Sequence, residues 1–426
     1  MGKEKPWEAA FYHYLRAWKA LSRREEKLAS FHSAECLRLC EGVGSHYTLH
    51  KAHILEAFVR QEFQDTEGAK QHLEKARRIP GHENNPHSRF TRLLTEAYFL
   101  LLERQDAAAQ EKLREGMQIG RRYGFFALFL WRPGLLEKLA TRALAEGIEV
   151  DYVKELIRRR NLLPDGPILE ADNWPWPVKV YMFGRFGIVL EGKKIPVSRK
   201  AQHVPVRMLK ALIAMGGREV SEERFGGVLW PDADGDQAHQ AFATTLRRLR
   251  KLLGCEKALL FSDGCLTLSN RHCWVDVWVF ERFLGKFERA REEGKREAVE
   301  AHCAQLIEKA IALYQGPFHL GDAFCSCIES HRERLRSKFL RCVESAGCHL
   351  ENGGQWGTAL ACYQKGLEVD DLAEELYRRL MICHRQLGQV AEALAVYHRC
   401  RRKLSAVLQM NPSPETEAVF RSLQTV

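Results

Sequence analysis

The stretch "QAFATTLRRLRKLL", residues 240–253, has the spacing of an amphipathic helix and packs four basic residues into five positions. Its large apolar residues recur at i, i+4, i+7 and i+11, and they are Phe242, Leu246, Leu249 and Leu253. At 100° per residue these positions fall within about 60° of one another, which predicts a buried stripe along one side. The opposite side then carries Gln240, Thr244, Arg247, Arg248 and Lys251, with Arg250 at its edge.

The outward side of this helix allows two interpretations. A basic run is often no more than a solvated helix face. The same residue types also suit a DNA duplex, because Arg donates two hydrogen bonds to guanine O6 and N7, Gln pairs with adenine, and Thr reaches a phosphate or a base. The neighbouring segments must decide between the two.

Two further helical segments come before this stretch. "QHVPVRMLKALIAMGG" (202–217) ends at a glycine pair, and "SEERFGGVLWP" (221–231) begins with a Ser N-cap and stops at a proline. We predict the third helix over residues 237–253, with Asp236 as its N-cap and Gly254 as its C-cap.

Strand signals lie on both sides of the three helices. Residues 178–197 predict strands, with bends or turns marked by Gly184, Gly187 and Gly192. In "ALLFSDGCLTLS" (258–269) an Asp-Gly pair separates two apolar runs, which predicts a tight hairpin. A sheet, three helices and a hairpin are the layout of a winged helix-turn-helix, whose third helix enters the major groove.

The rest of the chain predicts helical repeats. In the N-terminal part, residues 65–79 align with residues 105–119 at an offset of 40 residues. In the C-terminal part, "GQWGTALACYQKGL" (354–367) matches "GQVAEALAVYHRCR" (388–401) at an offset of 34 residues, the tetratricopeptide period. The predicted fold is therefore mainly α, with tetratricopeptide-like N- and C-terminal domains flanking a small α+β winged helix.

Four segments follow from this pattern. We expect a helical-repeat domain over 1–165, a Pro-rich linker over 166–177, a winged helix over 178–276 and a second repeat domain over 277–426. The formal net charge is +10, and residues 178–276 hold 16 Lys and Arg against 10 Asp and Glu. This excess favours double-stranded DNA as the partner and Gln240, Thr244, Arg247, Arg248, Lys251 and Arg250 as its contacts, with Arg250 as a flank or phosphate contact.

Other classes of function find little in the sequence. We expect no enzyme, no catalytic residue, no cofactor and no metal site, because histidine and cysteine spacings match no catalytic or zinc motif. We interpret Cys325 and Cys327 as residues packed in the hydrophobic core, and the more specific alternative is a redox or metal-binding role. No run approaches the roughly 20 apolar residues of a membrane span, so we expect no membrane partner and a cytoplasmic, nucleoid-associated protein.

Two blocks of the chain resemble known families. Residues 178–276 resemble the OmpR/PhoB-type winged helix of bacterial SARP-type regulators, through "VYMFGRFGIVLEGKKI", "AFATTLRRLRKLLG" and "WVDVWVFE". Residues 277–421 resemble the bacterial transcriptional activator domain, through "YQGPFHLGD" and "ESHRERLRSKFLRCVE". The N-terminal helices are more loosely similar to the arrays of large signal-transducing ATPase regulators. The resemblance implies an activator that binds promoter repeats through 237–253 and the wing 258–269 and contacts RNA polymerase.

Alternatives stay open beside this function. The chain could be a protein-interaction scaffold, or the C-terminal part of a larger ATPase-type regulator, since it has no GxxxxGK[ST] motif. The N-terminal array could bind a protein or a small effector, and "YGFFALFLWRPG" (123–134) is either a pocket for it or packing core. The sequence leaves open the operator, the direction of regulation and whether the chain forms a homo-oligomer.

Overall fold

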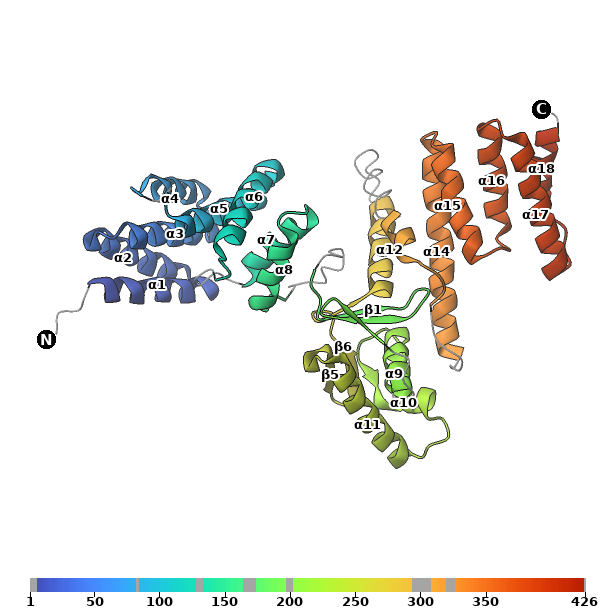
Figure 1. Cartoon of the computed structure of the whole chain (residues 1–426), viewed down its shortest axis with the longest axis horizontal. Coiled ribbons are helices and arrows are strands. Elements are labelled where there is room, and N and C mark those ends of the chain that lie inside the picture. The colour runs from blue at the N-terminus through green and yellow to red at the C-terminus, as the bar shows by residue number, and fades with distance from the viewer. Residues whose placement is uncertain are drawn as a thin grey trace. The chain divides into compact units, whose positions relative to one another are not determined.

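The chain is mainly helical and separates into two compact units, Met1–Pro175 and Trp176–Val426, in a computed structural model (Figure 1). The structure describes residues 6–81, 84–127, 133–163, 174–196, 202–292, 308–318 and 326–424. The predicted fold class, helical repeats with a small α+β winged helix, is confirmed.

The first unit is a row of antiparallel helix pairs. Its helices are α1 (Pro6–Ser22), α2 (Glu26–Val43), α3 (His46–Glu62), α4 (Thr66–Arg78), α5 (Pro86–Leu102), α6 (Asp106–Tyr123), α7 (Pro133–Ala145) and α8 (Val150–Arg159). The aligned segments of the predicted repeat fall on α4 and α6, where Ala69 and Ala109 are buried together with Leu73 and Leu113. Small and large apolar side chains at this spacing let the paired helices pack closely.

One turn geometry recurs between the two helices of a pair. A residue with positive φ comes first, and the backbone N–H of the next residue donates to the carbonyl five residues earlier. Between α5 and α6, Arg104 has φ of 60° and the Gln105 N–H donates to the Leu100 carbonyl at 2.9 Å. The same turn joins α3 to α4, where Asp65 donates to Arg60 at 2.9 Å. The C-terminal repeats place glycine at the strained position, Gly354 and Gly388, which removes the cost of a left-handed side chain.

Two pairs of histidines each link the two helices of one antiparallel pair, α1 with α2 and α3 with α4. The sequence analysis did not predict them. The Nδ1 atoms of His13 and His32 lie 3.0 Å apart, and those of His53 and His72 lie 3.1 Å apart. Burial lowers the pKa of His53 and of His72 to about 4. The folded unit therefore favours neutral rings, and this contribution to stability is lost as pH falls below the usual imidazole value toward 4.

The second unit begins with the winged helix. Its strands are β1 (Val178–Tyr181), β2 (Gly187–Leu190), β3 (Lys193–Ile195), β4 (Val220–Ser221), β5 (Leu259–Ser262), β6 (Cys265–Leu268) and β7 (Cys273–Val275). They form a four-stranded sheet of order β3-β2-β1-β7, with β1 and β7 parallel, and a three-stranded sheet of order β4-β6-β5. The helices between them are α9 (His203–Ala214), α10 (Glu222–Leu229) and α11 (Gly235–Leu253), with the 3₁₀ turn η2 (Glu256–Ala258) following.

Asp276 joins the winged helix to the helices that follow. Its buried carboxylate accepts backbone N–H groups from Met182 (2.8 Å), Phe183 (3.0 Å) and Val277 (2.8 Å), which ties the end of β1 to the start of α12 (Asp276–Glu292). Burial raises the pKa of Asp276 to about 6, although these three hydrogen bonds act in the opposite direction. A second tie is the bridge between Phe183 and Phe318.

The C-terminal helices form the second repeat array. They are α14 (Ser326–Asn352), α15 (Trp356–Val369), α16 (Glu374–Gln386), α17 (Val390–Leu408) and α18 (Pro414–Gln424). The recurring tyrosines of the predicted repeat, Tyr363 and Tyr397, are both buried. A Cβ on Gly347 would lie 2.1 Å from the Tyr363 ring, so glycine is required where α14 crosses α15. The Tyr397 ring stacks on Phe420 at 3.8 Å, and α18 thereby covers the end of the array.

Some local expectations need correction or fall outside the described residues. The N-cap of α11 is Asp234, whose carboxylate accepts the Gln237 N–H at 2.8 Å, so Asp236 lies inside the first turn. Gly187 begins β2 instead of marking a turn. Cys325 lies outside the described residues, as does the side chain of Cys327. Residues 128–132 of the aromatic segment also lie outside them. In the described part of the chain, no helix has the length and apolar content to cross a membrane.

Candidate nucleic-acid interface

The candidate interface is built on α11, which the winged helix holds by one side. Phe242, Leu246, Leu249 and Leu253 are all buried, as the periodicity predicts, and Phe242 packs against Phe225 of α10 with ring centroids 5.5 Å apart. Thr245 is also buried, which the sequence did not indicate. Gly254 has φ of 60° and closes the helix as the predicted C-cap. The inner stripe therefore fixes which side of α11 faces solvent.

The outward residues of α11 lie where the periodicity places them. Gln240, Thr244, Arg247, Arg248 and Lys251 are exposed. Within the described ranges, the cations Arg247, Arg248 and Lys251 form no salt bridge. Arg250 differs from them, because it is half-buried and its Nη2 donates to the Leu259 carbonyl of β5 at 3.3 Å. Arg250 thus connects α11 to the hairpin.

The predicted hairpin is formed by β5 and β6. Its turn residues Asp263 and Gly264 have φ of 51° and 70°, the left-handed pair that a tight two-residue turn needs. The turn is held from outside by the Glu222 N–H, which donates to the Gly264 carbonyl at 3.0 Å. Leu260 and Phe261 of β5 are exposed large apolar residues.

Two hollows flank α11, so that the helix stands between them as a ridge. The hollow on the hairpin side is about 700 Å³ and is lined by Ala243, Arg247 and Phe261 among others. The hollow on the other side is about 680 Å³ and is lined by Arg248 and by Ile195 and Pro196 after β3. Lys251 lines both. Basic side chains therefore face a recess on each side of the ridge.

One polar contact at this interface could not be foreseen from the sequence. His239 Nδ1 lies 2.6 Å from Glu222 Oε1, and the two residues are 17 positions apart. His239 sits in the first half of α11, and its side chain is 70% exposed. Only the packing of α10 beside α11 brings the pair together, and no local pattern reports it.

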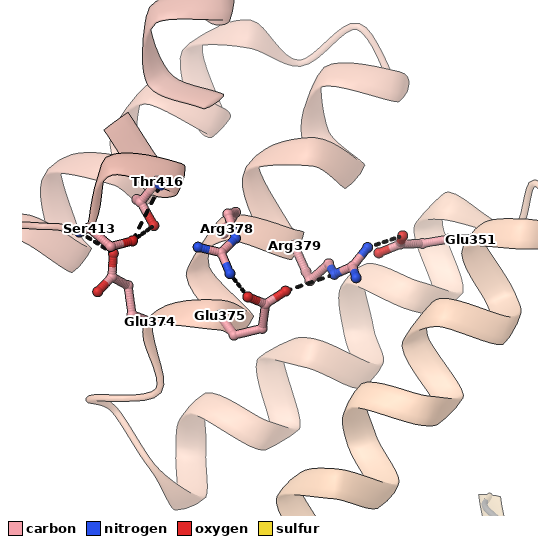
Figure 2. A network of polar contacts seen from close by, with 7 residues as sticks. All are labelled: Glu351, Glu374, Glu375, Arg378, Arg379, Ser413 and Thr416. Atoms are coloured by element: carbon pink, nitrogen blue, oxygen red, sulfur yellow. Dashed lines mark hydrogen bonds and ion pairs between the residues drawn. The ribbon is translucent and has the colours of Figure 1, made fainter. Parts of the chain in front are cut away.

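A second arginine pair shows what a neutralised basic helix looks like. In α16, Arg378 pairs with Glu375, and Arg379 lies 3.1 Å from both Glu375 and Glu351 (Figure 2). Glu374 of the same helix accepts the Ser413 N–H at 2.6 Å. Arg379 thereby links α16 to α14, whereas Arg247 and Arg248 of α11 form no salt bridge among the described residues.

No cluster of metal ligands accompanies this interface. Over the described ranges, no group of three or more His, Cys, Asp or Glu side chains is arranged to hold a metal ion. The free cysteines described in the structure are buried or half-buried, and burial raises the pKa of the Cys342 thiol to about 12. Such thiols are poor nucleophiles and poor ligands at neutral pH.

Comparison with known proteins assigns the C-terminal part of the chain. Residues 275–424 match the family model of the bacterial transcriptional activator domain. Regulatory protein AfsR of Streptomyces griseus is 28% identical over 214 residues, which cover 49% of this chain and 21% of that protein. AfsR of Streptomyces coelicolor is 27% identical over 214 residues, which cover 49% of this chain and 20% of that protein. The match thus spans about a fifth of the length of these relatives.

A solved structure gives a weaker likeness. Mycobacterium tuberculosis EmbR, in complex with a low affinity phosphopeptide, has a TM-score of 0.47 and 17% identity, covering 59% of this chain and 65% of that one. The activator-domain match and the two AfsR matches belong to transcriptional regulators and not to an enzyme family. They support the placement of this chain among the SARP-type bacterial transcriptional regulators.

Proposed function

We propose that the chain binds double-stranded DNA in a sequence-specific way, with α11 in the major groove and the β5–β6 hairpin along the backbone. The observation that carries the proposal is the exposed row of Arg247, Arg248 and Lys251 between two hollows. Cations without acidic neighbours are suited to phosphates, and a guanidinium is suited to the edge of guanine. Gln240 and Thr244 extend this row with groups that can read bases.

We further propose that the chain activates transcription by binding promoter repeats and contacting RNA polymerase. The support is the match of residues 275–424 to a domain described as a transcriptional activator domain. In this proposal α11 and the hairpin bind the promoter, and the helices α14–α18 form the surface that contacts RNA polymerase. Helical-repeat arrays commonly bind proteins along extended surfaces.

Fluorescence anisotropy with DNA from upstream of its own gene tests the DNA proposal. We expect R247A and K251A to weaken binding while the protein stays folded. A lost phosphate contact reduces the slope of log K against log salt by about one unit, and a lost base contact costs ~1–3 kcal/mol at one position. R401A, which removes an exposed arginine of α17, is the matched control and should bind like the original chain. Absence of binding to any upstream fragment at low salt contradicts the proposal.

A scaffold function is the second candidate, and the exposed Leu260 and Phe261 of β5 favour it, because apolar side chains suit a protein partner. A pull-down that persists at high salt after nuclease treatment, and that L260S removes, would support this function. We propose that an effector of the N-terminal array occupies a cavity in this unit. It measures about 190 Å³ between α1, α2 and α3 and is lined by Phe11, Tyr14 and Cys36 among others.

A further inference from the structure

The contact between His239 and Glu222 places a ring nitrogen at the proposed DNA surface. Glu222 is the first residue of α10, and its carboxylate meets His239 Nδ1 at 2.6 Å. The imidazole is 70% exposed and the carboxylate side chain 23% exposed, so the acid supports the ring from behind while the ring faces outward. The second nitrogen, Nε2, is free to meet a ligand, since the contacts of the described residues engage Nδ1 alone.

Glu222 is itself held in place by the wing. Its backbone N–H donates to the Gly264 carbonyl in the hairpin turn at 3.0 Å, and the preceding Ser221 pairs with Cys265 of β6. The carboxylate therefore starts from a backbone position that is fixed by α10 and by the hairpin together. Through this acid, the first half of α11 and the wing are set relative to each other.

The acid also decides which ring nitrogen carries the proton. An ionised carboxylate can only accept, so Nδ1 must donate to Glu222. In the neutral ring Nε2 is then left as an acceptor. In the major groove an acceptor is complementary to the exocyclic amino group of adenine or cytosine, and not to the two acceptors of guanine.

His239 lies in one row with Arg247 on the hairpin side of α11. The residue between them in this row is Ala243, whose short side chain leaves the two longer ones to reach outward. Eight residues of helix rise about 12 Å, which corresponds to roughly three to four base pairs at 3.4 Å each. The row therefore offers two reading positions at the ends of one hollow.

We propose that His239 is a specificity-determining residue of this interface, that its Nε2 accepts from the amino group of an adenine or cytosine, and that Glu222 is the positioning residue that holds the ring for this contact. The inference rests on DNA binding through α11 as proposed above. It adds a base preference that the basic residues alone do not supply.

Selection from a random duplex library at pH 8, above the usual titration range of imidazole, tests the inference with the full chain. We expect the original chain to prefer one base pair, through the amino group of its adenine or cytosine, at a position about three to four base pairs from the position read by Arg247. H239A should lose that single preference, by roughly two- to tenfold, the size of one net hydrogen bond. Preferences elsewhere and the salt dependence should stay as they are.

Variants of the acid separate positioning from general damage. E222Q replaces a carboxylate that can only accept with an amide that can also donate. The ring then no longer has one defined tautomer, and the same single preference should weaken. E223Q makes the same charge change on the neighbouring exposed residue and should leave the profile unchanged. H239Q keeps a side chain that can pair with adenine and should restore a preference for adenine.

The outcomes distinguish this inference from the DNA proposal. If the original chain selects no sequence, DNA recognition through α11 fails and the inference fails with it. If it selects a sequence and H239A or E222Q selects the same one with the same strength, only the inference is overturned.

Discussion

Two helices of the second unit carry nearly the same arrangement of residues, and they use it differently. In α11 the order is Thr244, two inward residues, then Arg247 and Arg248. In α16 the order is Glu375, two inward residues, then Arg378 and Arg379. The inward positions are buried in both helices. The main local difference is the residue three and four positions before the arginines, which is neutral in α11 and acidic in α16.

The difference shows that a basic run acquires its role from the acids within reach. In α16, Glu375 pairs with both guanidinium groups, and Arg379 also pairs with the more distant Glu351, which connects α16 to α14 (Figure 2). Beside α11, Glu222 lines the same hollow as Arg247 and is engaged with His239. The arginines of α11 are therefore left for a partner outside the chain, if the proposed function is correct.

The largest expected effect comes from making α11 like α16. T244E places a carboxylate three and four residues before Arg247 and Arg248, as Glu375 stands before Arg378 and Arg379. The new acid should occupy both guanidinium groups and repel phosphate. We expect DNA affinity to fall by about 100-fold or more, from one or two lost contacts at roughly 1–3 kcal/mol each. Fluorescence anisotropy measures it.

T244Q is the control for this graft, because it has the size of glutamate without the charge. It should lose less than about tenfold, since it removes at most the contact of one hydroxyl. The free energy of unfolding of both variants should lie within about 0.5 kcal/mol of that of the original chain, because position 244 is exposed. A T244E variant that binds DNA as tightly as T244Q would show that Arg247 and Arg248 do not carry the binding.

The next effect is on stability and falls on the other helix. Glu351 accepts from Arg379 at 3.1 Å and from the buried Tyr363 hydroxyl at 2.7 Å. E351A leaves both donors without this acceptor, and we expect a loss of about 2 kcal/mol in the free energy of unfolding. Urea unfolding followed by circular dichroism measures it. DNA affinity should not change, and E351Q, which keeps an acceptor for Tyr363, should lose less.

The local parts of this fold could be predicted from the sequence because their causes are local. The 3.6-residue period identified the buried side of α11, and the pair Asp263-Gly264 identified the hairpin turn. The N-cap was misplaced by two residues, since Asp234 and Asp236 are equally suitable in the sequence and only the helix start decides between them. The role of Arg250 depends on Leu259 of the hairpin, which no helical pattern contains.

The contacts that distinguish the two helices could not be predicted in the same way. His239 and Glu222 are 17 residues apart, and Glu351 and Arg379 are 28 residues apart. Both contacts form only after whole helices have packed, and single side chains then meet at their surfaces. The sequence therefore shows Glu375 four residues before Arg379, but it does not show Glu351, the second acid at this guanidinium, which comes from another helix.

Within α11, replacing Arg250 should have a smaller effect on stability, and it separates an arginine that binds the protein itself from Arg247, which is proposed to bind DNA. Its Nη2 bond to the Leu259 carbonyl makes it the cation of α11 that is already committed to the protein. R250M keeps the apolar stem and removes this bond, so we expect a loss of about 1 kcal/mol in the free energy of unfolding. Its effect on DNA affinity should be smaller than that of R247A. An R250M variant that is fully stable and binds DNA as poorly as R247A would make Arg250 a direct contact.

The smallest effect comes from making α16 like α11. E375T removes the acid that precedes Arg378 and Arg379, but Glu351 still holds Arg379 from α14. Surface pairs at this spacing contribute about 0.3–0.5 kcal/mol each, so the free energy of unfolding should fall by less than about 1 kcal/mol. E375Q should lose nearly as much, since charge and not size is removed. The freed Arg378 should not create a second DNA site, because it is not flanked by the hollows that accompany α11. Salt-dependent anisotropy of E375T in a T244E background, where α11 is neutralised, measures this directly. DNA binding regained there would show that one freed arginine suffices without the ridge.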